Sequence, residues 1–119
     1  MTDTELLEAA ARTAGIEYEP RYVEPAGVKP RGLMQPSGIA NIPPKWWNPL
    51  TDDGDALRLA VKLKMDVKQW QSNSIAVAIW DKHATEDATQ DRYAATRRAI
   101  VRAAAAMASG HNAVAQREP

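Results

Sequence analysis

Proline dominates the stretch between Gly15 and Lys45, which holds six of the eight prolines in the chain. Each proline fixes φ and removes a main-chain N–H, so a long helix or strand cannot pass through this spacing. The sequence predicts an irregular, proline-rich loop over residues 18–45, with at most a short hairpin at 33–39. Connections of this length in compact domains are usually functional or disordered. A plain meander and an extended binding loop are therefore the two interpretations.

The amino-terminal residues predict a helix. Thr2 and Glu5 have the spacing of a capping box, in which each side chain accepts a hydrogen bond from the other residue's main-chain N–H. Apolar residues follow at helical intervals from Leu6 to Ala14. Gly15 favours termination there, because glycine adopts the left-handed conformation at little cost.

A stronger helix-start signal lies just after the loop. Thr51, Asp52 and Asp53 can accept hydrogen bonds from the free N–H groups of a first helical turn, and their charge suits that end of the helix dipole. Apolar residues then recur at i, i+3, i+4 and i+7 from Ala56 to Leu63. We expect a helix that ends near Leu63.

A β-hairpin is predicted after this helix. Residues 65–70 and 75–80 are separated by the polar turn 71–74, and β-branched residues alternate with alanine in the second strand. Trp70 and Trp80 are expected to flank the open end of the hairpin, where they can pair across the strands.

A polar loop at 81–88 is expected to lead into a last helix at about 89–108. The stripe of that helix that faces the core comprises Tyr93, Thr96, Ile100, Ala104 and Met107. The predicted class is α+β, with about three helices packed on an antiparallel sheet that contains the hairpin. We expect one domain at 1–108 and a disordered tail at 109–119. The expected shared core comprises Ala56, Leu59, Leu63, Ile75, Val77, Ile79, Ile100 and Met107.

Composition excludes several kinds of chemistry. The chain has no Cys, which excludes disulfides, thiolate metal sites and cysteine catalysis. Its 15 basic residues balance its 15 acidic ones, so no whole-protein field would attract nucleic acid or membranes. No apolar run approaches the roughly 20 residues of a membrane span, and the amino terminus is acidic where a secretory signal would be basic. We expect a soluble, cytoplasmic protein.

No motif specifies a cofactor, metal or catalytic group. Aligning Gly54 with the glycine of a calcium loop puts Pro49 and Ala60 where the first and last carboxylate ligands belong. His83 and His111 are far apart, and nothing specifies carboxylate partners for them. We therefore expect no enzyme, no cofactor and no metal.

Two surfaces remain as candidate binding sites. Trp46 and Trp47 are adjacent in an extended segment, so one can enter the core while the other faces outward beside the loop. The predicted partner-binding residues are accordingly Trp46, Trp47, Pro43, Pro44 and Tyr22. The alternative is a nucleic-acid contact on the last helix through Arg97, Arg98 and Arg102. The simpler interpretation of these arginines is that they lie on the solvated side of that helix.

Several of these segments together resemble a family. The segment 47–56, the helix through Leu63, the hairpin and the segment 93–100 are similar to small phage and prophage proteins of the alpha-beta-alpha sandwich (NinX-like) family. The similarity covers roughly Trp46 to Met107. It leaves residues 18–45 unmatched, where such relatives would have regular strands.

The resemblance implies a phage accessory protein, and it brings no enzymatic activity and no catalytic residues. Together with the small size and the long loop, it predicts a non-enzymatic protein that binds a host or defence-system protein. Inhibition of an antiviral system such as CRISPR-Cas is one form of that function. A nucleic-acid-binding accessory protein is the competing class. The sequence does not specify the partner or the oligomeric state.

Overall fold

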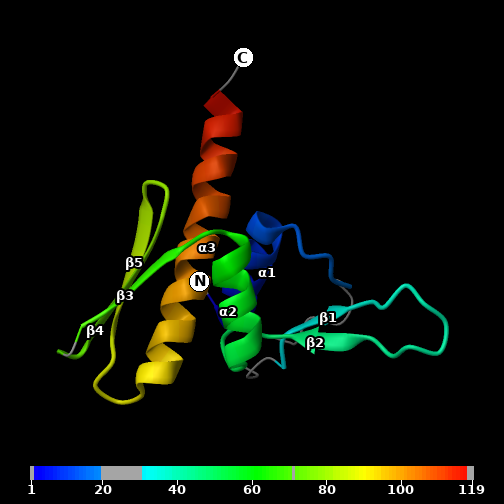
Figure 1. The fold of residues 1–119 in the computed structure, drawn as a ribbon. Coiled ribbons are helices and arrows are strands. Elements are labelled where there is room, and N and C mark those ends of the chain that lie inside the picture. The colour runs from blue at the N-terminus through cyan, green and yellow to red at the C-terminus, as the bar shows by residue number, and fades with distance from the viewer. Residues whose placement is uncertain (1, 20–30, 71, 118–119) are drawn as a thin grey trace.

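The computed structural model describes residues 2–19, 31–70 and 72–117, with side chains described as far as residue 108. The described residues form three helices and two antiparallel sheets (Figure 1), which confirms the α+β class. In chain order the elements are α1 (Asp3–Ala14), β1 (Leu33–Gln35), β2 (Lys45–Trp47), α2 (Asp53–Lys62), β3 (Asp66–Gln69), β4 (Ser74–Ile79), β5 (Lys82–Asp87) and α3 (Arg92–Arg117).

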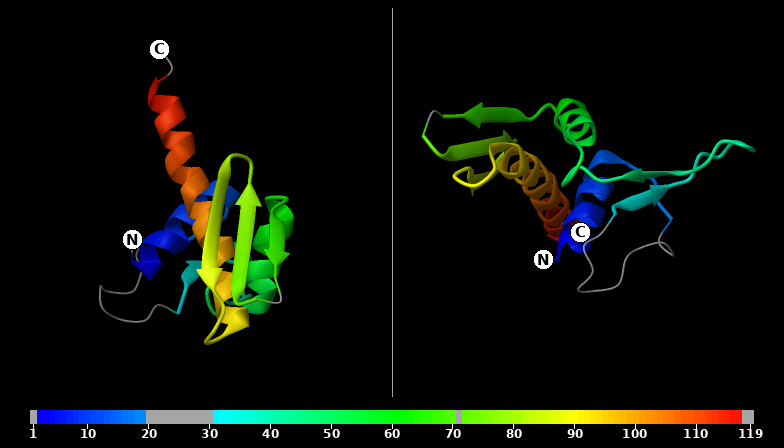
Figure 2. Two further views of the ribbon diagram at one scale, coloured as in Figure 1. Left: turned by 90° about the vertical axis from the view of Figure 1, so that its left-hand side faces the viewer. Right: turned by 90° about the horizontal axis from the view of Figure 1, so that it is seen from below.

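The long helix α3 lies at the centre of the fold, with the three-stranded sheet on one side and α1 on another (Figure 2). Buried alanines dominate the facing parts of α1 and α3, and such small side chains allow two helices to approach closely. The hydroxyl of Thr13 in α1 donates a hydrogen bond of 2.7 Å to the carbonyl oxygen of Ala104 in α3. The two helices are therefore joined by packing and by a polar contact.

The predicted caps of α1 are confirmed. The Glu5 N–H donates to the Thr2 hydroxyl at 3.1 Å, and the Thr2 N–H donates to the Glu5 carboxylate at 3.3 Å. Gly15 ends the helix at φ 70°. The helix start at Asp52 is also confirmed, because its carboxylate accepts from the Asp55 N–H at 2.7 Å.

The predicted hairpin is formed by β3 and β4, in a register that pairs Val67 with Val77. Ile75, Val77 and Ile79 are buried on the face toward α3, as expected from their alternation. The core prediction is confirmed, because six of its eight residues are buried while Leu63 and Met107 are half-buried against the same cluster.

The prediction of a loop at 81–88 is wrong, because Lys82–Asp87 forms the strand β5. Ala84 is its buried residue and lies opposite Val77. A strand with one small buried side chain has little hydrophobic signal of its own, and its pairing with β4 stabilises the extended conformation that the local sequence does not predict.

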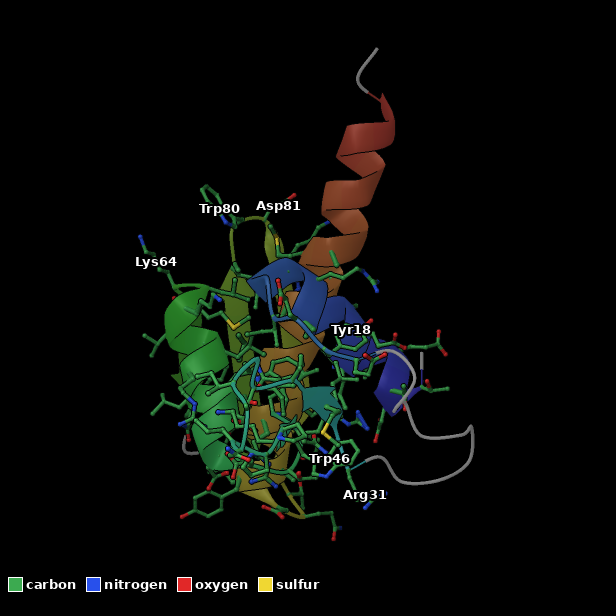
Figure 3. The ribbon with its side chains drawn as sticks, turned by 90° about the vertical axis from the view of Figure 1, so that its right-hand side faces the viewer. Tyr18, Arg31, Trp46, Lys64, Trp80 and Asp81 are labelled. Atoms are coloured by element: carbon green, nitrogen blue, oxygen red, sulfur yellow. The ribbon has the colours of Figure 1, made fainter. Side chains whose placement is uncertain are left out.

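The expected pairing of Trp70 with Trp80 is also wrong. The Trp70 N–H bonds to the Ser74 carbonyl at the turn, whereas Trp80 follows the far end of β4. Trp80 is 87% exposed and has φ 54° in the β4–β5 turn (Figure 3). Tyr93 was expected in the core but is 72% exposed in the first turn of α3.

Two boundaries also differ from expectation. The helix α3 begins at Arg92 and continues to Arg117. In its first turn the Ala94 N–H donates a hydrogen bond of 3.1 Å to the side-chain carboxylate of Asp91, which directly precedes the helix. The hairpin expected within 33–39 does not form, because β1 instead pairs with β2 across the whole of segment 36–44. Trp46 and Trp47 are therefore strand residues.

Candidate partner-binding arm

A two-stranded hairpin projects from the helical part of the molecule (Figure 1). Its strands pair Leu33 with Trp47 and Gln35 with Lys45, and residues 36–44 connect them at the far end. We call residues 33–47 the arm, and residues 36–44 its tip. The arm brings the tryptophan pair and the end of the proline-rich segment into one substructure.

The base of the arm is fixed in the core. Leu33 and Trp47 are 1% and 5% exposed, and they belong to the same buried cluster as the helices. Gly32 has φ 121°, and a Cβ at that position would lie 2.3 Å from the Trp47 carbonyl oxygen. Only glycine allows the main chain at residue 32 to come this close to the main chain of Trp47.

Trp46 points to the opposite side of the hairpin from Trp47, as the alternation predicts. It is half-buried, and the Arg31 guanidinium lies 5.0 Å from the centroid of its ring (Figure 3). This distance is within the range of a cation–π interaction. Trp46 is the outward-facing member of the pair, while the side chain of Trp47 is not available as a surface contact.

The tip has its own hydrogen bonds. The Ser37 hydroxyl donates its one proton to the carbonyl oxygen of Ile42 at 2.6 Å, with the carbonyl oxygen of Ile39 also within reach at 3.0 Å, and it accepts from the Ile39 N–H at 3.2 Å. Gly38 and Asn41 both have φ 69°, which suits these two residue types. These contacts restrict the conformation of the tip.

Apolar side chains are exposed at the tip. Ile39 is 61% exposed, Ile42 is 52% exposed, and Pro43 and Pro44 are exposed beside them. A hollow of about 370 Å³ lies along the tip between Met34, Pro36, Ile39 and Pro44. Sequence reasoning did not select the two isoleucines. The sequence signal that could have identified them is that both stand among glycine, asparagine and proline, outside any helical or strand pattern that would bury them.

The predicted site residues are only partly brought together. Trp46, Pro43 and Pro44 lie on the arm with accessible surface, and Trp47 anchors it. Tyr22 lies outside the described residues.

The arginines of the alternative nucleic-acid site bind groups within the protein. Arg97 donates to the Asp53 carboxylate at 2.6 Å and to the Leu50 carbonyl at 2.9 Å. Arg98 donates to Asp3 at 2.8 Å. These contacts connect α3 to the starts of α2 and α1.

Arg102 has the same kind of structural role. Its guanidinium forms an ion pair with Glu86 and donates to the Thr85 carbonyl oxygen at 2.9 Å. Each of the three arginines therefore has a carboxylate partner that a phosphate would have to replace.

The acidic cluster at 52–55 is likewise part of the fold. Asp52 caps α2, Asp53 pairs with Arg97, and Asp55 accepts from the Asn48 N–H at 3.0 Å and from Arg58 at 2.8 Å. Within the described ranges, no three His, Asp or Glu side chains gather as a metal ion would require. His83 is exposed on β5.

Among the described residues, three groups have a pKa shifted by hydrogen bonds or by burial. The Thr2 main-chain N–H, followed by the Thr2 hydroxyl, lowers the pKa of Glu5. The hydroxyl and then the N–H of Thr89 lower the pKa of Asp87. Burial and a 2.7 Å hydrogen bond to Glu8 raise the pKa of the Tyr18 phenol. All three belong to helix ends or packing contacts, and none lies at the arm tip.

Among the described residues, no helix combines the length and the apolar character needed to cross a membrane. Comparison with protein families, with curated proteins and with solved structures finds no match for this chain. The resemblance to NinX-like phage proteins therefore stays a prediction.

Proposed function

We propose that this chain is a non-enzymatic, phage-encoded accessory protein that binds a protein of the host cell or of its defence systems in the cytoplasm. The arm is the binding element. A partner of this kind could be an antiviral effector, such as a CRISPR-Cas component, whose action the bound protein blocks.

The observation that carries the proposal is the exposed apolar tip of a projecting, anchored hairpin. Ile39 and Ile42 present apolar surface to solvent at the end of an arm whose base is buried. Exposed apolar groups of this kind become favourable when a partner covers them. The Ser37 hydrogen bonds and the prolines restrict the free tip, which lowers the entropy cost of ordering it on binding.

The alternative function, binding of nucleic acid, receives less support from the same structure. Electrostatic binding to nucleic acid requires Lys or Arg side chains that neutralise phosphates and so release the counterions condensed on the nucleic acid. Arg97, Arg98 and Arg102 already have carboxylate partners, so phosphate binding would break contacts that hold α3 in place.

The two functions are separated by binding measurements on the folded protein. Immobilised wild-type chain and the variant Ile39→Ser/Ile42→Ser are exposed to host lysate, and captured proteins are identified by mass spectrometry. The proposal expects a protein that the wild type retains and the variant does not. The control is Arg98→Ala/Arg102→Ala, which removes contacts of α3 with Asp3 and Glu86 but none of the arm, and which is used after circular dichroism shows that it is folded.

Binding to plain DNA and RNA is measured in parallel over a series of salt concentrations. Tight binding that falls steeply with salt and is lost in the Arg98→Ala/Arg102→Ala variant would favour the nucleic-acid function and contradict the proposal. The same capture result for wild type and tip variant would also contradict it.

A further inference from the structure

The two outer strands of the three-stranded sheet differ in how their edges are protected. The order is β3-β4-β5, so β3 and β5 are the edges among the described strands (Figure 2). Edge strands expose main-chain donors and acceptors that can pair with another chain, and proteins commonly block them.

The edge of β5 is blocked from within the chain. The β4–β5 pairing places the Thr85 main chain on the outer side of β5, and the Thr85 carbonyl oxygen accepts from Arg102 at 2.9 Å. The Arg102–Glu86 ion pair lies beside it. A second strand cannot add here without displacing Arg102.

The edge of β3 has its pairing groups in a regular order. The Trp70 N–H bonds to the Ser74 carbonyl, and hydrogen-bonded pairs alternate in an antiparallel ladder. Lys68 and Asp66 therefore bond to β4, whereas the N–H and C=O groups of Val67 and Gln69 point to the outer edge. No described strand pairs on that side.

An apolar groove lies next to this edge. It has a volume of about 500 Å³ and is lined by Val67 of β3, Ala56, Leu57 and Ala60 of α2, and Tyr93 and Ile100 of α3. Leu57 and Tyr93 are more than half exposed. The core-facing side of the sheet therefore continues past β3 into uncovered apolar surface.

The charges of β3 are complementary to those of a second β3 strand. In an antiparallel pair centred on Val67, the two Val67 residues lie opposite each other on the core-facing side. Asp66 of each copy then lies opposite Lys68 of the other, on the solvent side. Opposite charges at directly facing positions stabilise a strand pair, while like charges destabilise it.

We propose that the protein forms a two-fold symmetric dimer through β3, in which two three-stranded sheets become one six-stranded sheet. The outward N–H and C=O groups of Val67 pair across the two-fold axis, and the added strand extends the sheet over the groove. This is an isologous contact, in which the same surface serves both copies. The arm lies on the other side of α3 and stays accessible in the dimer (Figure 1).

The test is a charge-reversal series measured by sedimentation equilibrium from micromolar to millimolar protein. Wild type should reach twice the 13.1 kDa chain mass. Asp66→Lys and Lys68→Asp should each weaken the dimer at least tenfold, because each places like charges opposite one another twice. The double variant Asp66→Lys/Lys68→Asp should restore it. Asp81→Lys, on the β4–β5 turn, is the control for charge alone.

Two further variants guard against loss of folding. Val67→Pro removes an N–H that points to the outer edge, so the hairpin with β4 is retained while the dimer is lost. Val67→Cys introduces the only thiol of the chain and should give a disulfide-linked dimer on oxidation, unlike the control Thr85→Cys on β5.

The proposal is overturned if the wild type is monomeric throughout the concentration range. This holds also if β3 is then found to pair with a different protein. A dimer that survives both single reversals and Val67→Pro overturns it as well. Failure of the arm to bind a partner has no bearing on this result, since the dimer is measured with the purified chain alone.

Discussion

The main-chain N–H of Asn48 donates a hydrogen bond of 3.0 Å to the side-chain carboxylate of Asp55, and both residues are buried. This contact joins the end of β2 to the first turn of α2. It connects the arm to the helical core at the point where the chain leaves the hairpin.

Replacing Asp55 with Ala should destabilise the protein by about 1–3 kcal/mol, because the buried Asn48 N–H loses its acceptor. Asp55→Asn keeps an oxygen at this position and should cost less. Urea unfolding measures both free energies, with exposed Asp81→Ala as the control. Equal stability of Asp55→Ala and wild type would show that the contact does not support the arm.

The close approach of Gly32 to Trp47 gives a second prediction. Gly32→Ala should be strongly destabilising, because its Cβ would meet the Trp47 carbonyl oxygen at 2.3 Å. Gly38→Ala at φ 69°, where a Cβ meets nothing within 4 Å, should cost only the roughly 1–2 kcal/mol of left-handed backbone. Thermal unfolding of the pair checks this order, and a reversed order would contradict the packing of the arm base.

A third prediction concerns the acidic start of α2. Asp52→Ala should cost about 0.5–2 kcal/mol, because the Asp55 N–H loses its cap. Calcium should leave the melting temperature of the wild type unchanged, since the carboxylates of this cluster already have partners in the fold. A calcium-dependent rise in melting temperature would reveal a site that these contacts do not account for.

Asp87 gives a prediction about pH. Its pKa is lowered in the folded protein, chiefly by the Thr89 hydroxyl. A lowered pKa stabilises the fold above the ordinary aspartate pKa, and this stabilisation is lost as the pH falls through the folded value. Thr89→Val should therefore raise the pKa of Asp87 and weaken this acid dependence. Carboxyl NMR titration measures the shift, with Glu5 as an internal control that should not move.

The sequence predicts elements whose signals are local. Thr2 with Glu5, and Asp52 before Ala56, identify helix starts because the caps depend on neighbours within three or four residues. The alternation of β4 likewise gives its buried face.

Elements that depend on distant partners were missed. The strand β5 has few apolar residues and gains its structure by pairing with β4, and β2 pairs with β1 across the tip. Trp70 directly precedes the predicted turn 71–74, so it lies at the closed end of the hairpin and not at the open end where it was placed. Tyr93 fits the helical stripe of α3 but is exposed, because periodicity alone does not specify which part of the stripe other elements cover.

The candidate site was only partly predictable for the same reason. Alternation correctly placed Trp46 and Trp47 on opposite sides of the chain, but which one entered the core depended on the pairing of Trp47 with Leu33. Exposure of Ile39 and Ile42 follows from the length of the arm, which no local pattern shows. The carboxylate partners of the α3 arginines come from α1, α2 and β5, so sequence alone left those cations as candidates.

The central claim, that the arm tip binds a partner protein, is tested most directly by the affinity of the captured partner for three forms of the chain. Isothermal titration is carried out with wild type, Ile39→Ser/Ile42→Ser and Arg98→Ala/Arg102→Ala, each first shown to be folded by circular dichroism. We predict that the tip variant binds at least tenfold more weakly, about 1.4 kcal/mol, while the arginine variant stays within a factor of about three of wild type. A tip variant that binds like wild type, with binding abolished in the arginine variant, would contradict the account.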